Sequence, residues 1–172
     1  YLRTGRPLPE ETVNHMRKFS QTLAKYGDGT QLQSRYTMRG SMQGMGRVAF
    51  EKPVSVNFEA ANGQPGVDLW FESKRFPAVL NGVVKDVSRE PGYGNYIVIE
   101  STDPNTGMKV DVLYSHLADG IALTPGQQIY AGDIIGTQGG TGNVRSADGT
   151  IASIDFLAPA PRGSKSMVPY PE

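Results

Sequence analysis

Side chains that could do chemistry gather in three short segments of this 172-residue chain. They are Gln64-Pro65-Gly66-Val67-Asp68-Leu69, Tyr114-Ser115-His116-Leu117 and Ser153-Ile154-Asp155-Phe156. Carboxylates and an imidazole can hold metal ions or exchange protons. Ser153 and Asp155 are two residues apart, so a regular strand would point both side chains to the same side.

One combination of these residue types would be nucleophilic. Ser153, His116 and an aspartate nominally form a Ser-His-Asp set. Nothing in the chain resembles the strained Gly-x-Ser-x-Gly elbow, and Ser153 falls inside an expected strand. A serine hydrolase is therefore not expected.

Composition bounds the classes of protein to consider. The chain is 38% hydrophobic with 21 glycines and 12 prolines, which favours strands and turns over a helical bundle. Its 17 basic and 17 acidic residues balance, so no nucleic-acid partner is expected. The absence of cysteine excludes disulfides and thiolate metal sites. No apolar run approaches the roughly 18 residues of a membrane span.

A helix and a linker are expected in the N-terminal part of the chain. Between Glu10 and Tyr26 apolar side chains recur every three or four residues, which predicts an amphipathic helix. Gly40 to Gly46 is glycine-rich and predicts a linker or long turn. The length suits one domain with an extension, and the start at Tyr1 without methionine predicts a processed product or fragment.

Short runs rich in β-branched and aromatic residues follow the linker, separated by turn signals such as Pro91-Gly92 and Pro125-Gly126. The expected strands are Val54 to Glu59, Val67 to Phe71, Ala78 to Val87, Tyr96 to Glu100, Lys109 to Ser115, Gln128 to Tyr130, Ile134 to Thr137 and Ile151 to Leu157. Strands at such spacing indicate an all-β sandwich or barrel instead of a βαβ fold.

In order and spacing, the three polar segments resemble the motifs of the M23 metallopeptidases, the LytM and lysostaphin family that cuts peptide cross-links in bacterial cell walls. The family motifs read His-x-Gly-x-Asp, Tyr-x-His and His-x-His-Phe. The run from Leu123 to Gly136 also resembles a hairpin of this family and of other hybrid-motif barrels, and Gly139 to Asn143 resembles its Gly-Ser-Thr-Gly turn. The resemblance covers roughly residues 54 to 158.

The resemblance implies a mainly β fold, an antiparallel β-sandwich or barrel of the duplicated hybrid-motif type, to which the apolar spacing adds one N-terminal α-helix. The expected domain limits are then the helix and glycine-rich linker at 1–46, which have no counterpart in the family, an M23/LytM-like β domain at 47–160 and a C-terminal tail at 161–172.

Carried onto this chain, the zinc ligands of the family map to Gln64, Asp68 and Asp155. Zinc prefers imidazole and thiolate donors to amide oxygens, so no zinc and no other metal cofactor is expected. Calcium or magnesium at the same three oxygen donors is the weaker alternative. The two histidines that flank the metal-bound water map to His116, which is retained, and Ser153, which cannot carry positive charge. Asp155 would then pair with His116 and raise the pKa of its imidazole.

The function implied is a catalytically degenerate M23-like domain that acts as a binding, regulatory or structural module in a bacterial cell envelope or a phage tail or injection machine. An active cell-wall endopeptidase with an altered metal site is the alternative. The partner would be a protein or a peptidoglycan peptide, with an extracytoplasmic, envelope or phage-particle location. The expected groove residues are Gln64, Asp68, Tyr114, His116, Ser153 and Asp155.

Overall fold

Antiparallel strands make up most of the structure, a computed structural model that describes residues 8, 10–25, 51–60, 65–102 and 107–159. Its elements are α1 (Glu10–Lys25), β1 (Ser55–Glu59), β2 (Gly66–Trp70), β3 (Arg75–Pro77), β4 (Gly82–Glu90), β5 (Gly94–Thr102), β6 (Lys109–Leu117), β7 (Gln128–Ile129), β8 (Ile134–Thr137) and β9 (Ala152–Leu157). The predicted mainly β fold with an N-terminal helix is confirmed.

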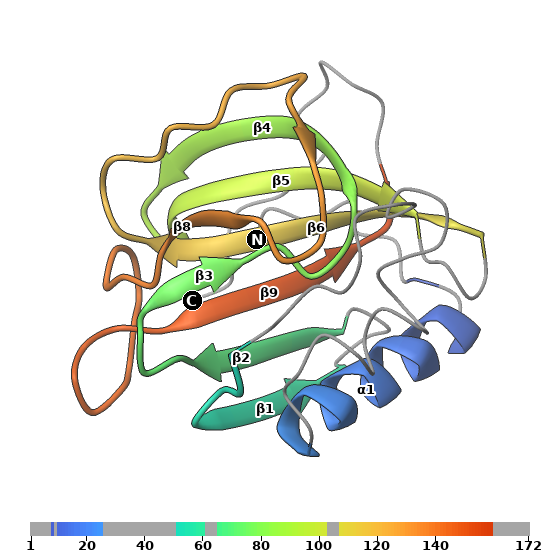
Figure 1. Ribbon diagram of the computed structural model, residues 1–172, viewed down its shortest axis with the longest axis horizontal. Helices are drawn as coiled ribbons and strands as arrows, with labels where there is room; N and C mark the ends of the chain where they lie inside the picture. Colours follow the sequence, from blue (N-terminus) through green and yellow to red (C-terminus); the bar gives the residue numbers. More distant parts are fainter. Residues whose placement is uncertain (1–7, 9, 26–50, 61–64, 103–106, 160–172) are drawn as a thin grey trace.

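Two sheets form the layers of the domain. The large sheet has seven strands in the order β1-β2-β9-β6-β5-β4-β7, and β3 pairs with β8 in a two-stranded sheet that lies in front of it (Figure 1). The large sheet begins at β1 and ends at β7 without closing on itself. The architecture is therefore a sandwich, and the barrel form of the prediction is not what the structure has.

The predicted strands all overlap observed ones. One observed strand was missed, and one was predicted to begin too early. The short strand β3 was not predicted, because three residues ending in a proline give little alternation. The stretch predicted from Ala78 to Val87 becomes a strand only at Gly82. Ala78 instead exchanges backbone hydrogen bonds with Gly132 and Asp133, in the turn between β7 and β8.

Helix α1 lies beside β1 at the edge of the large sheet (Figure 1). Glu10 and Glu11 occupy its first turn, where acidic side chains favour the helix dipole, and Val13 and Met16 are buried in the core. No helix in the described ranges is long and apolar enough to cross a membrane. The predicted linker at 40–46 and tail at 161–172 lie outside the described residues, so the domain limits stay predictions.

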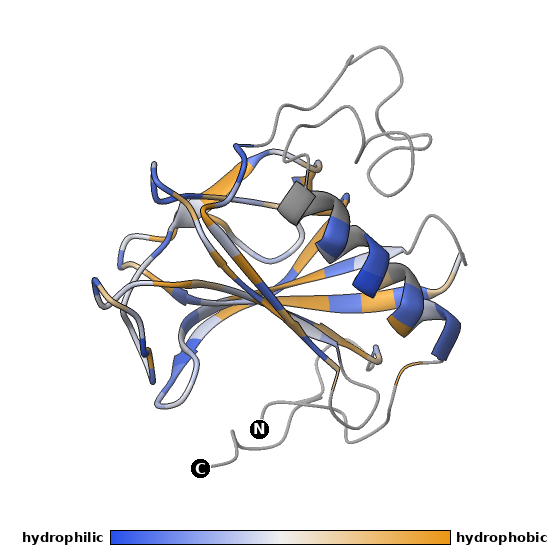
Figure 2. Cartoon of the chain, turned by 90° about the horizontal axis from the view of Figure 1, so that it is seen from below, coloured by the Kyte–Doolittle hydropathy of each residue, from blue (hydrophilic) through white to orange (hydrophobic). Residues whose placement is uncertain are grey.

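The two faces of the large sheet bury different clusters. The main core lies between the sheets and collects alternate residues of β2, β9 and β6: Val67, Leu69, Ile154, Phe156, Val112 and Tyr114. A smaller cluster of Tyr93, Tyr96, Val98, Leu113 and Leu157 comprises side chains outside that core. Apolar and polar segments alternate along the strands (Figure 2). At its centre, β6 therefore places apolar side chains on both faces, with Val112 and Tyr114 in the main core and Leu113 in the smaller cluster.

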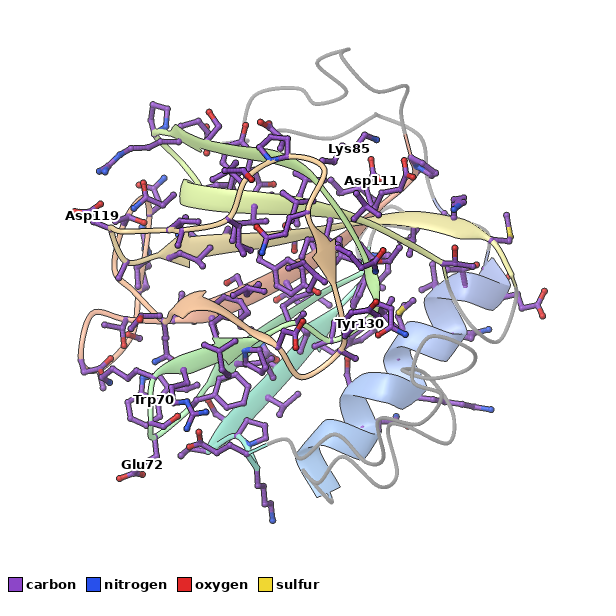
Figure 3. All side chains as sticks on the ribbon, turned by 45° about the horizontal axis from the view of Figure 1, so that its top comes forward. Trp70, Glu72, Lys85, Asp111, Asp119 and Tyr130 are labelled. Atoms are coloured by element: carbon purple, nitrogen blue, oxygen red, sulfur yellow. The ribbon has the colours of Figure 1, made fainter. Side chains whose placement is uncertain are left out.

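A buried ion pair joins β4 to β6 across β5. Lys85 Nζ lies 2.6 Å from Asp111 Oδ2, and the two side chains sit together in Figure 3. Lys85 occupies a register irregularity of β4 between Val84 and Asp86. Such an irregularity can re-aim a side chain, here toward the carboxylate that balances its charge.

The glycine-rich turn after β8 docks onto the β4–β5 turn. Thr141 Oγ1 accepts a hydrogen bond from the Asn95 backbone N–H at 3.0 Å and donates one to the Leu117 carbonyl at 2.7 Å. Gly94 has a φ of 66°, and a Cβ there would lie 2.3 Å from Thr141 Oγ1. A glycine is thus needed at position 94 for both its backbone conformation and its lack of a side chain.

We predict that Gly94→Ala lowers the free energy of unfolding by more than the roughly 1–2 kcal/mol of a left-handed non-glycine residue, because the Thr141 turn must also move. Urea denaturation measures the loss. Gly107→Ala is the matched control, since Gly107 has a φ of 73° and open space around it. Equal losses in the two variants would show that the close approach to Thr141 costs nothing.

Candidate functional site

A row of polar residues crosses four neighbouring strands. The register places Asp68 of β2 opposite both Asn57 of β1 and Ser153 of β9, and Ser153 opposite Ser115 of β6. Directly opposed residues of antiparallel strands point to the same face of a sheet. Asn57, Asp68, Ser153 and Ser115 therefore form one row, here called the polar row, on the face away from the main core.

A second row lies on the same face, two residues away from the polar row on each strand. It contains Glu59, Gly66, Asp155 and Leu113. A Cβ on Gly66 would lie 2.4 Å from Asp155 Oδ1, so the Asp155 carboxylate leans over β2 at this glycine. Asp155 thus shares a face with the polar row and inclines toward the strand that carries Asp68. Ser153 and Asp155 lie on one side of β9, as the sequence predicts.

The clearest contact of the site joins Ser153 to Asp68. Ser153 Oγ donates to Asp68 Oδ1 at 2.6 Å, a short charge-assisted hydrogen bond. Ser153 is buried, whereas Asp68 is exposed. The hydroxyl proton is therefore committed to a carboxylate and not to His116, which is not the arrangement of a Ser-His-Asp nucleophile.

The backbone at His116 is in an unusual conformation. Its φ is 63°, in the left-handed region that residues with a side chain rarely occupy. The β5–β6 register shifts here, because Asn95 pairs with Leu117 while Ile97 pairs with Tyr114. Two residues of β6 thus oppose one of β5, which is a β-bulge. The bulge places Ser115 and His116 together between two core residues.

Two hydrogen bonds fix His116 in this position. Its backbone N–H donates to the Tyr93 carbonyl at 2.8 Å, and its Nδ1 lies 2.8 Å from the Thr141 carbonyl oxygen. A carbonyl oxygen can only accept, so Nδ1 carries the proton and a neutral ring has its lone pair on Nε2. The docked turn therefore sets the tautomer of the imidazole.

The pKa of His116 is lowered from its ordinary value. Burial of the ring is the main cause, and it outweighs the hydrogen bond to Thr141 and the charges of Asp68 and Glu90, which all raise the pKa. The predicted raised pKa is therefore wrong, because desolvation exceeds the attraction of nearby carboxylates. The carboxylate that acts on the ring from the site is Asp68 and not the predicted Asp155.

Tyr114 does not line this face. Its side chain is fully buried in the main core, where its ring meets Phe76 edge to face and its hydroxyl accepts the Val79 backbone N–H at 3.1 Å. Burial raises the pKa of its phenol far above the ordinary value. The predicted groove role of Tyr114 is corrected to one of support, because residue 114 points away from Ser115.

The register thus brings Asp68, Ser153 and Asp155 to one face, and the Asp68 charge reaches the His116 ring, while the predicted Gln64 lies outside the described residues. Sequence reasoning missed Ser115, Asn57 and Glu59, whose places in the two rows follow only from the strand register. No group of three or more histidine, cysteine or acidic side chains in the described ranges is arranged to hold a metal ion.

The chain is similar to known peptidases. The model of Peptidase family M23 matches residues 62–153. A candidate glycyl-glycine endopeptidase lytM from Ruminococcus gnavus is similar in structure, with 25% identity and a TM-score of 0.37 over 52% of this chain and 37% of that one. A candidate M23 peptidase from Pseudomonas aeruginosa has 16% identity and a TM-score of 0.44 over 88% and 58%. No curated protein matches significantly. The chain thus spans less than two thirds of either solved structure.

We predict that Tyr114→Phe lowers the free energy of unfolding by about 1–3 kcal/mol, because the buried Val79 N–H loses its acceptor. Urea denaturation checks this. Tyr130→Phe is the control, since that hydroxyl bonds to no described residue and the side chain is partly exposed (Figure 3). A loss no larger than that of the control would argue against the structural role.

The lowered pKa of His116 predicts a stability that falls with acid. The unfolded ring binds a proton near pH 6.5 and the folded ring only at lower pH, so the unfolded state gains more protons below about pH 6.5. Urea midpoints of the wild type should therefore fall further between roughly pH 7 and pH 5 than those of His116→Gln. A wild type that loses less than the variant would reverse the sign and contradict the burial argument.

Proposed function

Because the chain belongs to peptidase family M23, whose model spans residues 62–153, we propose that its β domain is a non-catalytic member that binds a peptide or a protein on the face of the polar row. The observation that carries the proposal is the Ser153–Asp68 hydrogen bond. Ser153, at the position of a family histidine, instead donates a hydrogen bond to Asp68, at the position of a zinc ligand.

The donor set argues against zinc. The family positions hold an amide at Gln64 and carboxylates at Asp68 and Asp155, and zinc in proteins prefers imidazole and thiolate donors. One oxygen of Asp68 already accepts the Ser153 hydroxyl. The residues therefore do not fit the ion, and no hydrolytic step is assigned to it.

The remaining imidazole is also poorly suited to catalysis. His116 is 5% exposed, its Nδ1 proton is committed to Thr141, and burial lowers its pKa. A neutral ring offers one lone pair and no positive charge to a developing oxyanion. Position 153, where the family has its second imidazole, offers only a hydroxyl.

The family supports a setting in a bacterial cell envelope, or in a phage tail or injection machine, with a peptidoglycan peptide or another protein as partner. In that setting the module would position or regulate its partner without cutting it. Strand pairing and the docked Thr141 turn hold the face in place, which suits a binding surface.

We predict that purified protein carries no stoichiometric zinc and does not cleave peptidoglycan or glycine-rich peptides. Elemental analysis and a peptide-release assay with and without a chelator test this. Bound calcium or magnesium at the carboxylates would leave the loss of catalysis intact but revise the face to a cation site. One zinc per chain with chelator-sensitive cleavage would instead establish the active endopeptidase with an altered metal site.

Restoring the family histidines tests whether the proposed loss of zinc binding is confined to the site residues. Gln64→His, Ser153→His and Asp155→His together restore the family donor set, so the triple variant should bind zinc tightly and hydrolyse slowly at best. Single changes should do little, because groups that act as a unit are not additive. Phe156→Ala, in the core beneath the site, controls for destabilisation alone. A folded triple variant without zinc would mean that the groove has been rebuilt.

A further inference from the structure

The face that carries the two rows is acidic, although the chain as a whole has no net charge. The whole sequence is balanced at 17 basic and 17 acidic residues, yet the two rows hold three carboxylates, Glu59, Asp68 and Asp155, and no lysine or arginine. Opposed strands hold these carboxylates on one face. The face therefore favours a cationic ligand.

A second observation points to a ligand at the same place. Ser115, at the end of the polar row beside Ser153, is 1% exposed, and its hydroxyl has no hydrogen-bond partner among the residues that the structure describes. Buried hydroxyls are nearly always satisfied, and an unsatisfied one destabilises the fold. The Ser115 side chain points to the face that carries Asp68, so a polar group bound on this face could satisfy it.

The groups on this face are mainly hydrogen-bond acceptors. The Ser153 hydroxyl donates its hydrogen bond to Asp68, which leaves the serine oxygen as an acceptor, and the tautomer of His116 leaves a lone pair on Nε2. A protonated primary amine presents three donors and one positive charge. In the described residues, no group of three or more acidic or histidine side chains is arranged to hold a divalent cation such as calcium, which prefers several carboxylate and carbonyl oxygens around one centre.

From this arrangement we propose that the face built by Asp68, Ser115, Ser153 and Asp155 binds the protonated primary amine of a peptide. The amine is a lysine-type side chain or a free amino terminus, two sources of the same ammonium group. The inference rests on the proposed binding function and names the ligand chemistry of that face.

A substitution at Gly66 tests the proposal without changing the charge of the protein. Its φ is ordinary, and the nearest atom to an added Cβ is the end of the Asp155 side chain. Gly66→Ala should therefore fold normally while displacing only that carboxylate. Weaker binding in this variant would report the position of Asp155 and not the net charge of the protein.

The probe is acetyl-Ala-Lys-Ala-amide, titrated by calorimetry and by amide chemical shifts. The norleucine and Nε-acetyl-lysine versions remove the charge, and Ala-norleucine-Ala-amide offers only the amino terminus. We expect saturable binding of at least one amine-bearing peptide and none of the uncharged ones. Equal binding of the uncharged peptides, or no saturable binding of either amine-bearing peptide at millimolar concentration, would overturn the proposal.

Variants locate the amine. Asp68→Asn and Asp155→Asn should each weaken binding about tenfold or more, and Gly66→Ala and Ser115→Ala about threefold to tenfold. Ser115→Ala should not destabilise the free protein, because within the described ranges its hydroxyl has no hydrogen bond to lose. Glu72→Gln, an exposed acid outside both rows, is the matched charge control (Figure 3). An equal loss in Glu72→Gln would show a diffuse charge effect and refute the site.

Sedimentation with peptidoglycan sacculi separates this inference from the proposed function. Acetylating the free amines of the sacculi should abolish co-sedimentation if the amine is recognised. Binding that survives acetylation would refute amine recognition and leave the binding module standing. Zinc-dependent cleavage would refute the non-catalytic function, whereas the contrast between lysine and norleucine peptides would still decide amine recognition.

Discussion

The site depends on the register of β9 between β2 and β6. Ile154 and Phe156 are buried in the main core, and that packing fixes Ser153 and Asp155 on the opposite face. A slip of one residue would bury both polar side chains and expose both apolar ones. The core therefore determines which side chains meet Asp68, and the site geometry follows from packing that contains no catalytic group.

This separation explains how site residues can change without loss of the fold. Positions 153 and 155 contribute no side chain to the main core, so a serine and an aspartate there leave the packing of Ile154 and Phe156 untouched. The chemistry of the face changes instead, because short oxygen groups replace the imidazoles that the family carries at these positions. Gly66 accommodates one of them, since the Asp155 carboxylate occupies the space above this glycine.

Alternation and motif order were enough to predict most strands and the shared face of Ser153 and Asp155. They failed where the face of a strand was ambiguous. In β6 both Leu113 and Tyr114 are apolar and fully buried, so the sequence does not say which one faces the groove. The bulge at His116 adds a residue that simple alternation cannot anticipate. The pKa direction of His116 depends on burial by distant segments, which no local pattern reveals.

The left-handed backbone at His116 costs on the order of 1–3 kcal/mol and persists only where surrounding structure over-determines it. Here the Tyr93 and Thr141 carbonyls hold the residue from two sides, and Gly94 and Gly142 let the two turns approach closely enough to supply them. None of these contacts involves a metal ligand position. The imidazole is therefore placed by the turns alone, and its Nε2 is an oriented acceptor whose position does not depend on any residue of the polar row.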